Sequence, residues 1–314
     1  MHPLFTFIIE YIKCQLNFGI NKFNRLSSCP FCVTLPRMLR PVDIITIYYL
    51  LSLNFITLLF RPFLPHWYLY FFAHFMFAIF IFLLGIIRKR YSNKVVEFIS
   101  YFYPWFSTPQ LYEETRTYLH VIFPGFFDHL VQKWEFSLFG VLPNIYLEKF
   151  ACPWLTEILS FGYISYYLFF LIPPFVFYFC KRDGLEELIF SMALVYYISF
   201  LGFILFPVAS PRFALAGQFK APLQGYLIPK IQAQLMETFA LRGGAMPSSH
   251  VAMAVASTLV TKRYFKKIYP IMLILAILIM LGAIYGRYHY VTDVVIGAIL
   301  GIIAAKIAHL IYKK

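Results

Sequence analysis

Charged residues are scarce in this sequence. Asp, Glu, Lys and Arg together make up 13% of its 314 residues, whereas roughly a quarter of a soluble domain is charged. Apolar residues make up 61%, and the mean hydropathy is +0.72. This composition excludes an ordinary soluble enzyme, and the length divides naturally into membrane spans of about 20 residues each. We therefore expect an all-α, polytopic transmembrane helix bundle.

Cysteine is also rare, which limits the chemistry that thiols can provide. The five cysteines cannot form an even set of disulfides, and only Cys29 and Cys32 have a C-x-x-C spacing. This single pair lacks the second ligand pair of a structural zinc site, and it has no βαβ context for redox work. We expect neither a metal nor a cofactor.

Negative charge is outnumbered, and the net charge is +13. The positive residues fall in short clusters at the ends of apolar runs, such as 88–90, 181–182 and 313–314. Lys and Arg collect in cytoplasmic loops, so this pattern indicates membrane topology and not nucleic-acid binding. The stretch 95–112 is ambiguous, because Glu97, Pro104 and Pro109 interrupt its apolar sequence. If it crosses the bilayer, all these basic loops lie in the cytoplasm, so the charge pattern favours eight crossings over seven.

The apolar runs divide the chain into three parts. Residues 1–41 are expected to form an N-terminal cytoplasmic or interfacial segment, because Glu10 and Lys13 interrupt its apolar part and no secretory signal is convincing. Accessory transmembrane and interfacial helices follow in 42–157, and a catalytic transmembrane core in 158–314. The clear spans are 44–60, 68–87, 158–180, 185–206, 249–260, 268–284 and 291–311.

Within these parts, two features interrupt the pattern of spans. Pro173 and Pro174 predict a kink in 158–180, and the stretch 207–247 is the one long polar connection. The interfacial region before residue 158 carries acidic side chains that could border a site, although solvated surface charge is the more typical reading; they are Glu113, Glu114, Asp128 and Glu135.

Three short polar clusters interrupt the apolar sequence of the last third of the chain. They are Phe206–Arg212, Gly244–His250 and Tyr285–Asp293, and each lies at the end of an apolar run. If these ends lie on one side of the membrane, two arginines, two histidines, an aspartate and a pair of serines converge. The basic loops place that side outside the cytoplasm, so we expect an exoplasmic site in a bacterial inner (plasma) membrane.

The second cluster opens a helix with serine. Serine before an apolar run is an N-cap signal, and the free N–H groups of a first helical turn form an anion site. A capped helix with no further role would show the same pattern. His250, however, would lie in that first turn, where an imidazole can give or take a proton near neutral pH.

In the third cluster, His289 and Asp293 are four residues apart and share one face of a helix. A carboxylate bonded to one imidazole nitrogen leaves the other free to attack phosphorus. Placing ionisable groups at the end of a membrane span costs free energy, so this position favours a functional role for the pair over a purely structural one. Arg212 and Arg287 are candidate phosphate clamps, because a guanidinium binds phosphate through a planar fork; snorkelling at headgroup level is the alternative.

Together the clusters resemble the signature of the type 2 phosphatidic acid phosphatase superfamily, in particular its branch of inositol phosphorylceramide synthases and bacterial lipid phosphatases. Pro247–His250 resembles the Pro-Ser-Gly-His motif, with Ser249 in place of glycine. His289 and Asp293 match the third motif, and Pro211–Arg212 resembles the end of the first. The resemblance covers roughly residues 158–311.

The sequence departs from this signature at two cationic positions. The third motif has an arginine six residues before its histidine, and that position is Ala283 here. Arg287 is the candidate substitute, and it would approach the phosphate from a different direction. The lysine of the first motif would fall at Leu205, with Lys220 as a candidate stand-in. These differences concern the phosphate clamp and the substrate, and they leave the two histidines intact.

The resemblance implies a six-helix phosphatase-type core and a metal-independent lipid phosphatase. The substrate would be a lipid phosphate or pyrophosphate ester in the bilayer, with no nucleic-acid partner; the sequence does not indicate the oligomeric state. His289 would attack phosphorus while Asp293 orients it, and His250 would protonate the leaving oxygen. The implied phosphate ligands are Arg212, Arg287, Ser248 and Ser249. A phospho-headgroup transferase of the inositol phosphorylceramide synthase type, and a non-catalytic lipid-binding or transport protein, remain open alternatives.

Overall fold

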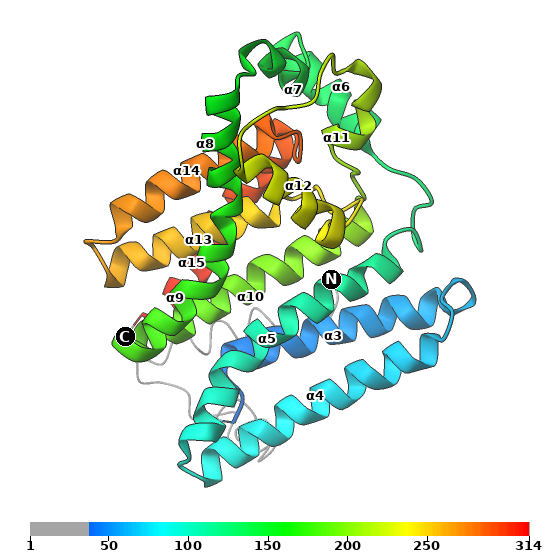
Figure 1. Cartoon of the computed structure of the whole chain (residues 1–314). Helices are drawn as coiled ribbons and strands as arrows, with labels where there is room; N and C mark the ends of the chain where they lie inside the picture. The colour runs from blue at the N-terminus through cyan, green and yellow to red at the C-terminus, as the bar shows by residue number, and fades with distance from the viewer. Residues whose placement is uncertain (1–37, 314) are drawn as a thin grey trace.

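The computed structural model describes residues 38–313, and these form helices joined by loops (Figure 1). The predicted all-α fold is therefore confirmed. The segment before Met38, with Cys29 and Cys32, lies outside the described residues. The α-helices are α3 (Pro41–Leu59), α4 (Trp67–Arg90), α5 (Lys94–Tyr118), α6 (Asp128–Phe139), α7 (Pro143–Leu147), α8 (Pro153–Ile164), α9 (Tyr166–Cys180), α10 (Arg182–Leu205), α11 (Pro211–Ala214), α12 (Ile228–Phe239), α13 (Ser249–Tyr264), α14 (Tyr269–Tyr285) and α15 (Val291–Tyr312).

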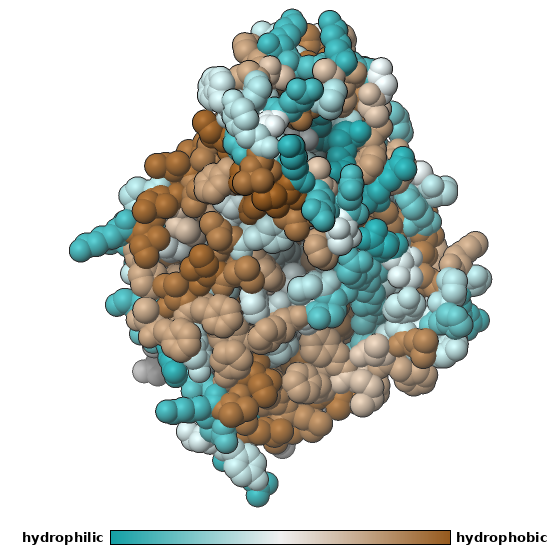
Figure 2. Space-filling model, in the orientation of Figure 1, coloured by the Kyte–Doolittle hydropathy of each residue, from teal (hydrophilic) through white to brown (hydrophobic). Residues whose placement is uncertain are grey.

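Within residues 38–313, five stretches are long and apolar enough to cross a membrane: α3, α4, α8 with α9, α10 and α15. Helix α14 is apolar but shorter, at 17 residues. Figure 2 shows apolar side chains over much of the sides of the molecule, while polar residues gather at the end near α6, α7 and α11. The chain is an integral membrane protein; eight crossings stay a prediction.

Helix α5 is one continuous helix of 25 residues, although Pro104 and Pro109 lie inside it. At 1.5 Å per residue it is about 37 Å long, which exceeds the roughly 30 Å hydrocarbon core of a bilayer. The hydroxyl of Thr108 donates to the Pro104 carbonyl at 2.9 Å, next to the disrupted part of the helical ladder. The ambiguous stretch 95–112 is thus part of one continuous helix, but α5 is not among the five stretches apolar enough to cross, so its crossing stays a prediction.

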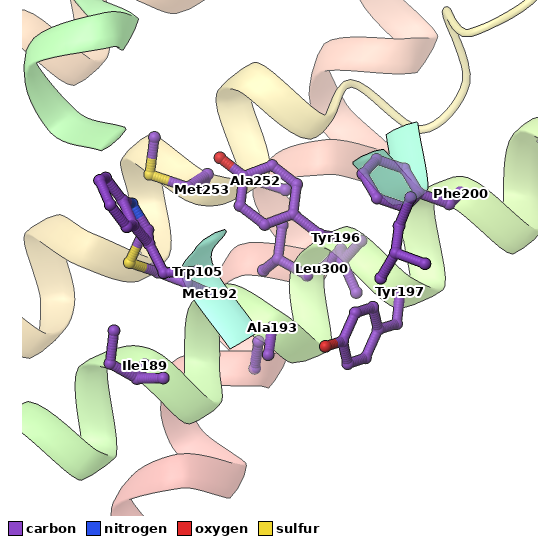
Figure 3. Packing of buried hydrophobic residues seen from close by; sticks show 14 of the residues in the cluster. Trp105, Ile189, Met192, Ala193, Tyr196, Tyr197, Phe200, Ala252, Met253 and Leu300 are labelled. Carbon is purple, nitrogen blue, oxygen red and sulfur yellow. The ribbon is translucent and has the colours of Figure 1, made fainter. Parts of the chain in front are cut away.

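Helix α10 lies at the centre of the molecule. It contacts α9, α13 and α15 on one side and α3 and α5 on the other (Figure 1). Figure 3 shows Met192 and Tyr196 of α10 packed with Ala252 and Met253 of α13 and with Leu300 of α15. The accessory helices α3–α5 therefore rest on the same central helix as the bundle of α8–α10 and α13–α15.

Two glycines let α15 approach the start of α13. A Cβ atom on Gly297 would lie 2.5 Å from the Ser248 carbonyl oxygen, and one on Gly301 would lie 2.4 Å from that of Ala252. Side chains at these positions would force the helices apart, so glycine permits the close packing. This contact places the first turn of α15 beside the first turn of α13.

The helix expected over 158–180 is divided in two at Ser165, and the kink at Pro173 and Pro174 stays a prediction. Helix α8 ends at Ile164 and α9 begins at Tyr166, while Pro173 and Pro174 both lie inside α9. The hydroxyl of Ser165 donates to the Gly162 carbonyl at 2.6 Å. A serine hydroxyl that binds the backbone in this way competes with the helical ladder, which accounts for a break at Ser165.

Candidate active site

The three polar clusters meet at the end of the bundle that carries α6, α7 and α11. Backbone hydrogen bonds join the loops directly, so their relative positions do not depend on long side chains. The bonds run from Val208 N to Gly243 O at 3.2 Å, Ala245 N to Val208 O at 3.1 Å, Arg212 N to Arg287 O at 2.8 Å and Ser248 N to Asp293 O at 3.1 Å. The predicted convergence of the clusters is therefore present.

The rings of His250 and His289 lie next to each other. Their centroids are 5.9 Å apart, and the ring planes make an angle of 58°. His250 belongs to the first turn of α13, and His289 lies in the loop just before α15. The close packing of these two helices at Gly297 brings together two imidazoles that are 39 positions apart in the sequence.

The Nδ1 atom of His289 lies 2.9 Å from the carbonyl oxygen of Ala245 and 3.5 Å from Oδ2 of Asp293. A carbonyl only accepts hydrogen bonds, so Nδ1 carries the proton and the lone pair is on Nε2. The same Oδ2 also accepts the N–H of Tyr290 at 2.9 Å, which caps the start of α15. The ring of His289 is thus oriented mainly by Ala245, with the Asp293 carboxylate as a second, longer contact.

His250 packs against aromatic rings that the sequence analysis did not identify. Its centroid lies 5.0 Å from that of Tyr163 and 4.1 Å from that of Tyr166. Tyr163 in turn stacks on Tyr288 at 4.7 Å with an interplanar angle of 15°. The run of tyrosines around residue 165 was the available signal. These rings exclude water from one side of the two histidines.

The first turn of α13 provides unpaired backbone donors. The hydroxyl of Ser248 accepts the N–H of Val251, but at 3.5 Å the bond is long. The N–H groups of Ser249 and His250 lie in the first turn of α13, where the helix has no carbonyl four residues earlier to accept them. Such donors, aligned with the helix dipole, form a binding site for an anion beside the two imidazoles.

The two predicted arginines have different surroundings. The Cζ atom of Arg212 lies 5.5 Å from the ring centroid of Tyr288, and no ion pair holds its side chain within residues 38–313. Arg287 is 9% exposed, and it donates to Glu148 at 3.1 Å and to the Ala221 carbonyl at 3.0 Å. Arg212 therefore contacts Tyr288 but has no carboxylate partner within residues 38–313, while the guanidinium of Arg287 already holds the polar connection.

A third arginine lies at the same end of the molecule. The Cζ atom of Arg242 is 5.1 Å from the ring centroid of Phe213, and that of Arg212 is 4.4 Å from the same ring. The bridge between Val208 and Gly243 brings the two loops side by side. Arg242 is exposed, as a residue at the mouth of a site would be. The only sequence signal was its place just before the second cluster.

Two acidic residues of α6 support the loops from the outside. Asp128 accepts the N–H groups of Ala209 at 2.7 Å and Ser210 at 3.2 Å, and the hydroxyl of Tyr290 at 3.0 Å. It is 5% exposed. The expectation of solvated charge is therefore wrong for Asp128, because its carboxylate satisfies buried loop donors that have no other acceptor.

Glu135, about two turns further along α6, has the same kind of role. Its Oε1 atom accepts the N–H and the hydroxyl of Thr292 at 2.8 and 3.1 Å. Burial raises the pKa of the Glu135 carboxyl, and the hydrogen bonds from Thr292 oppose that shift. Solvated charge is the wrong expectation here too, whereas Glu113 is exposed and pairs with Arg116 at 3.3 Å.

The next segments complete this support. Asn144 of α7 donates to the carbonyl oxygens of Ile284 at 2.8 Å and His289 at 3.1 Å. The N–H groups of Ala221 and Lys220, with the charge of Arg287, hold the pKa of Glu148 below its usual value. Residues before position 158 thus position the third cluster, although the division of the chain at that position stays a prediction.

Within residues 38–313, no three His, Cys, Asp or Glu side chains group as a metal site requires. Comparison with known proteins gives two matches. A model of the PAP2 superfamily matches residues 132–307. The crystal structure of Aquifex aeolicus LpxE is similar, with 21% identity, a TM-score of 0.42, and coverage of 52% of this chain and 91% of that chain. No curated protein matches.

Proposed function

Because this chain belongs to the PAP2 superfamily, we propose that it hydrolyses a phosphate or pyrophosphate ester of a membrane lipid through a phosphohistidine on His289. Family membership supports a phosphatase that acts on lipids, and the apolar helices support a substrate within the bilayer. One observation carries the mechanism: two imidazoles lie 5.9 Å apart beside the unpaired N–H groups of a helix start.

His289 is the proposed nucleophile. The Ala245 carbonyl keeps the proton on Nδ1, so the lone pair of Nε2 attacks phosphorus. A bond forms between Nε2 and phosphorus as the bond from phosphorus to the lipid oxygen breaks. The ring becomes cationic in this step, and the nearby carboxylate of Asp293 stabilises that charge.

His250 is the proposed general acid and base. In the first step it gives a proton to the departing lipid oxygen, which leaves as an alcohol. In the second step it takes a proton from water, whose oxygen attacks the phosphohistidine and releases inorganic phosphate. The distance between the two rings suits a phosphorus atom bonded to one imidazole while its leaving oxygen faces the other.

The phosphate oxygens are proposed to bind the hydroxyls of Ser248 and Ser249 and the N–H groups of Ser249 and His250, together with Arg212. We add Arg242 as the second cation, because it shares the ring of Phe213 with Arg212. We prefer it to Lys220 as the stand-in for the missing lysine, because no contact joins the side chain of Lys220 to Arg212 or Phe213 within residues 38–313. Arg287 acts by holding the loop, through its ion pair with Glu148.

The mechanism is tested with purified protein and a short-chain lipid phosphate. We expect His289→Ala to abolish release of inorganic phosphate, and radiolabelled phosphate to remain on wild-type protein after rapid denaturation. His129→Ala is the matched control, because His129 is an exposed histidine of α6. Near-normal turnover in His289→Ala would refute the mechanism. Accumulation of a new phospholipid in place of inorganic phosphate would identify a headgroup transferase.

A further inference from the structure

A second polar cluster lies among the accessory helices, outside the region that the family model matches. His74 of α4 places Nδ1 2.8 Å from Oδ1 of Asn54 and Nε2 2.7 Å from Oε1 of Glu114. His74 is 3% exposed. Ionisable groups at membrane depth are costly and usually mark a functional site. Glu114, expected to be solvated charge, is thus partly buried against this histidine.

The same two residues line a cavity between α4 and α5. Its volume is 470 Å³, within the range of about 300 to 1,000 Å³ for sites that bind small molecules. Its walls include Phe77 of α4 and Ile99 of α5, so most of the lining is apolar. We call this cavity the α4–α5 groove.

The shape of the groove fits one lipid chain. The residues that line it on α5 run from Ile99 to Glu114, which is about 22 Å along a helix. One leaflet of the hydrocarbon core is about 15 Å thick. Glu114 lies in the last two turns of α5, at the end that leads to α6, and α6 supports the loop before α15 through Asp128.

The polar end of the groove has unused hydrogen-bonding capacity. Nε2 of His74 and Oε1 of Glu114 lie 2.7 Å apart and therefore pair with each other. The unused group is the amide of Gln110, one turn before Glu114, which also lines the groove and is exposed. A bound group that both donates and accepts would pair with this amide.

The charge of the groove selects against a lipid phosphate. The single carboxylate is paired with His74, and no Lys or Arg lines the groove. A phosphate headgroup would therefore find no free cation there. An uncharged hydroxyl, with one donor and two acceptor positions, matches the paired charges and the amide of Gln110.

From these observations we propose that the α4–α5 groove binds a long-chain lipid with a free hydroxyl group. The proposed reaction releases such a lipid, and a transferase would accept one. The connection between the groove and the reaction rests on the proposed function, whereas the binding of the lipid to the groove does not. The groove is close enough to exchange lipid with the site, because Tyr112 of the same helix accepts the N–H of Leu241, next to Arg242.

The competing explanation is that Asn54, His74 and Glu114 only hold three helices together, as polar groups do in other membrane bundles. The two explanations differ at Gln110, for which no protein partner is found within residues 38–313. Gln110→Leu keeps the volume and leaves the ion pair intact. Met76→Leu is the matched control, because Met76 is 59% exposed on α4 outside the groove.

The test uses the full chain in phosphatidylcholine nanodiscs with a diazirine-labelled long-chain alcohol. We expect saturable photolabelling of α4 and α5 that unlabelled alcohol or diacylglycerol suppresses. Loss of one hydrogen bond in Gln110→Leu should weaken binding about five-fold, and Met76→Leu should bind like the wild type. Labelling that does not saturate, or that is equal in both variants, would overturn the proposal.

Two further outcomes separate this proposal from the proposed reaction. Competition by a lipid phosphate as strong as by the alcohol would overturn the preference for an uncharged group. The same labelling is measured in His289→Ala, which retains the groove. Labelling that persists in a wild-type protein without hydrolytic activity would refute the proposed reaction and leave the groove assignment standing.

Discussion

Replacing Gly297 by alanine should separate the two halves of the active site. The added Cβ would lie 2.5 Å from the carbonyl oxygen of Ser248, and ordinary contact begins at 3.4 Å, so α15 and α13 must move apart by about 0.9 Å. Overpacking of this kind costs about 1–3 kcal/mol of stability. A misplacement near 1 Å in a catalytic site can lower the rate about 100-fold. Because His289 and Asp293 move with α15 and His250 with α13, we expect kcat to fall by about that factor.

The assay is the initial rate of phosphate release together with the melting temperature in the same detergent. Gly125→Ala is the control, because no atom lies within 4 Å of a Cβ at that position. We expect Gly297→Ala to remain folded, with a lowered melting temperature, and the control to match the wild type in both measurements. Wild-type kcat in Gly297→Ala would show that helix spacing does not determine the geometry of the histidines.

Other predictions concern the acid, the supports and the pH range. His250→Ala should slow hydrolysis strongly, and a substrate with a very good leaving group should partly restore the rate, because departure then needs no proton; equal loss with both substrates would contradict this role. Asp128→Ala leaves three buried donors unpaired at about 1–3 kcal/mol each, so thermal unfolding should detect a large loss of stability, with a smaller loss in Asp128→Asn. Since the folded pKa of Glu148 is lowered, its stabilisation of the polar connection is present at neutral pH and is lost as pH falls through that pKa. Protease cleavage within 215–227 should therefore rise in acid for the wild type and already at neutral pH for Glu148→Gln. Added chelator should leave the rate unchanged, because the proposed steps use only histidine chemistry; loss of activity in EDTA would point to a metal enzyme.

The amino-acid sequence alone determined the helical membrane fold, and it selected two histidines that the structure places side by side. Apolar periodicity and end signals are local, so the expected spans 268–284 and 291–311 agree with α14 and α15 to within one residue at each end. The serine before α13 also predicted its start correctly. The sequence predicted that the three polar clusters meet, on the assumption that the span ends that carry them lie on one side of the membrane.

The acidic supports and the division of labour among the arginines were decided by the tertiary structure. Asp128 and Glu135 resemble surface charge in sequence, because the loop N–H groups that they accept lie about 80 and 160 positions away. The role of Arg287 differs from the expected phosphate clamp for the same reason, because Glu148, the partner that holds its guanidinium, is 139 positions distant. Arg242, to which the sequence assigned no role, lies over the rings of Phe126 and Phe213. Local patterns report the conformation of a segment, whereas the acceptor for each buried donor depends on which distant segment packs against it.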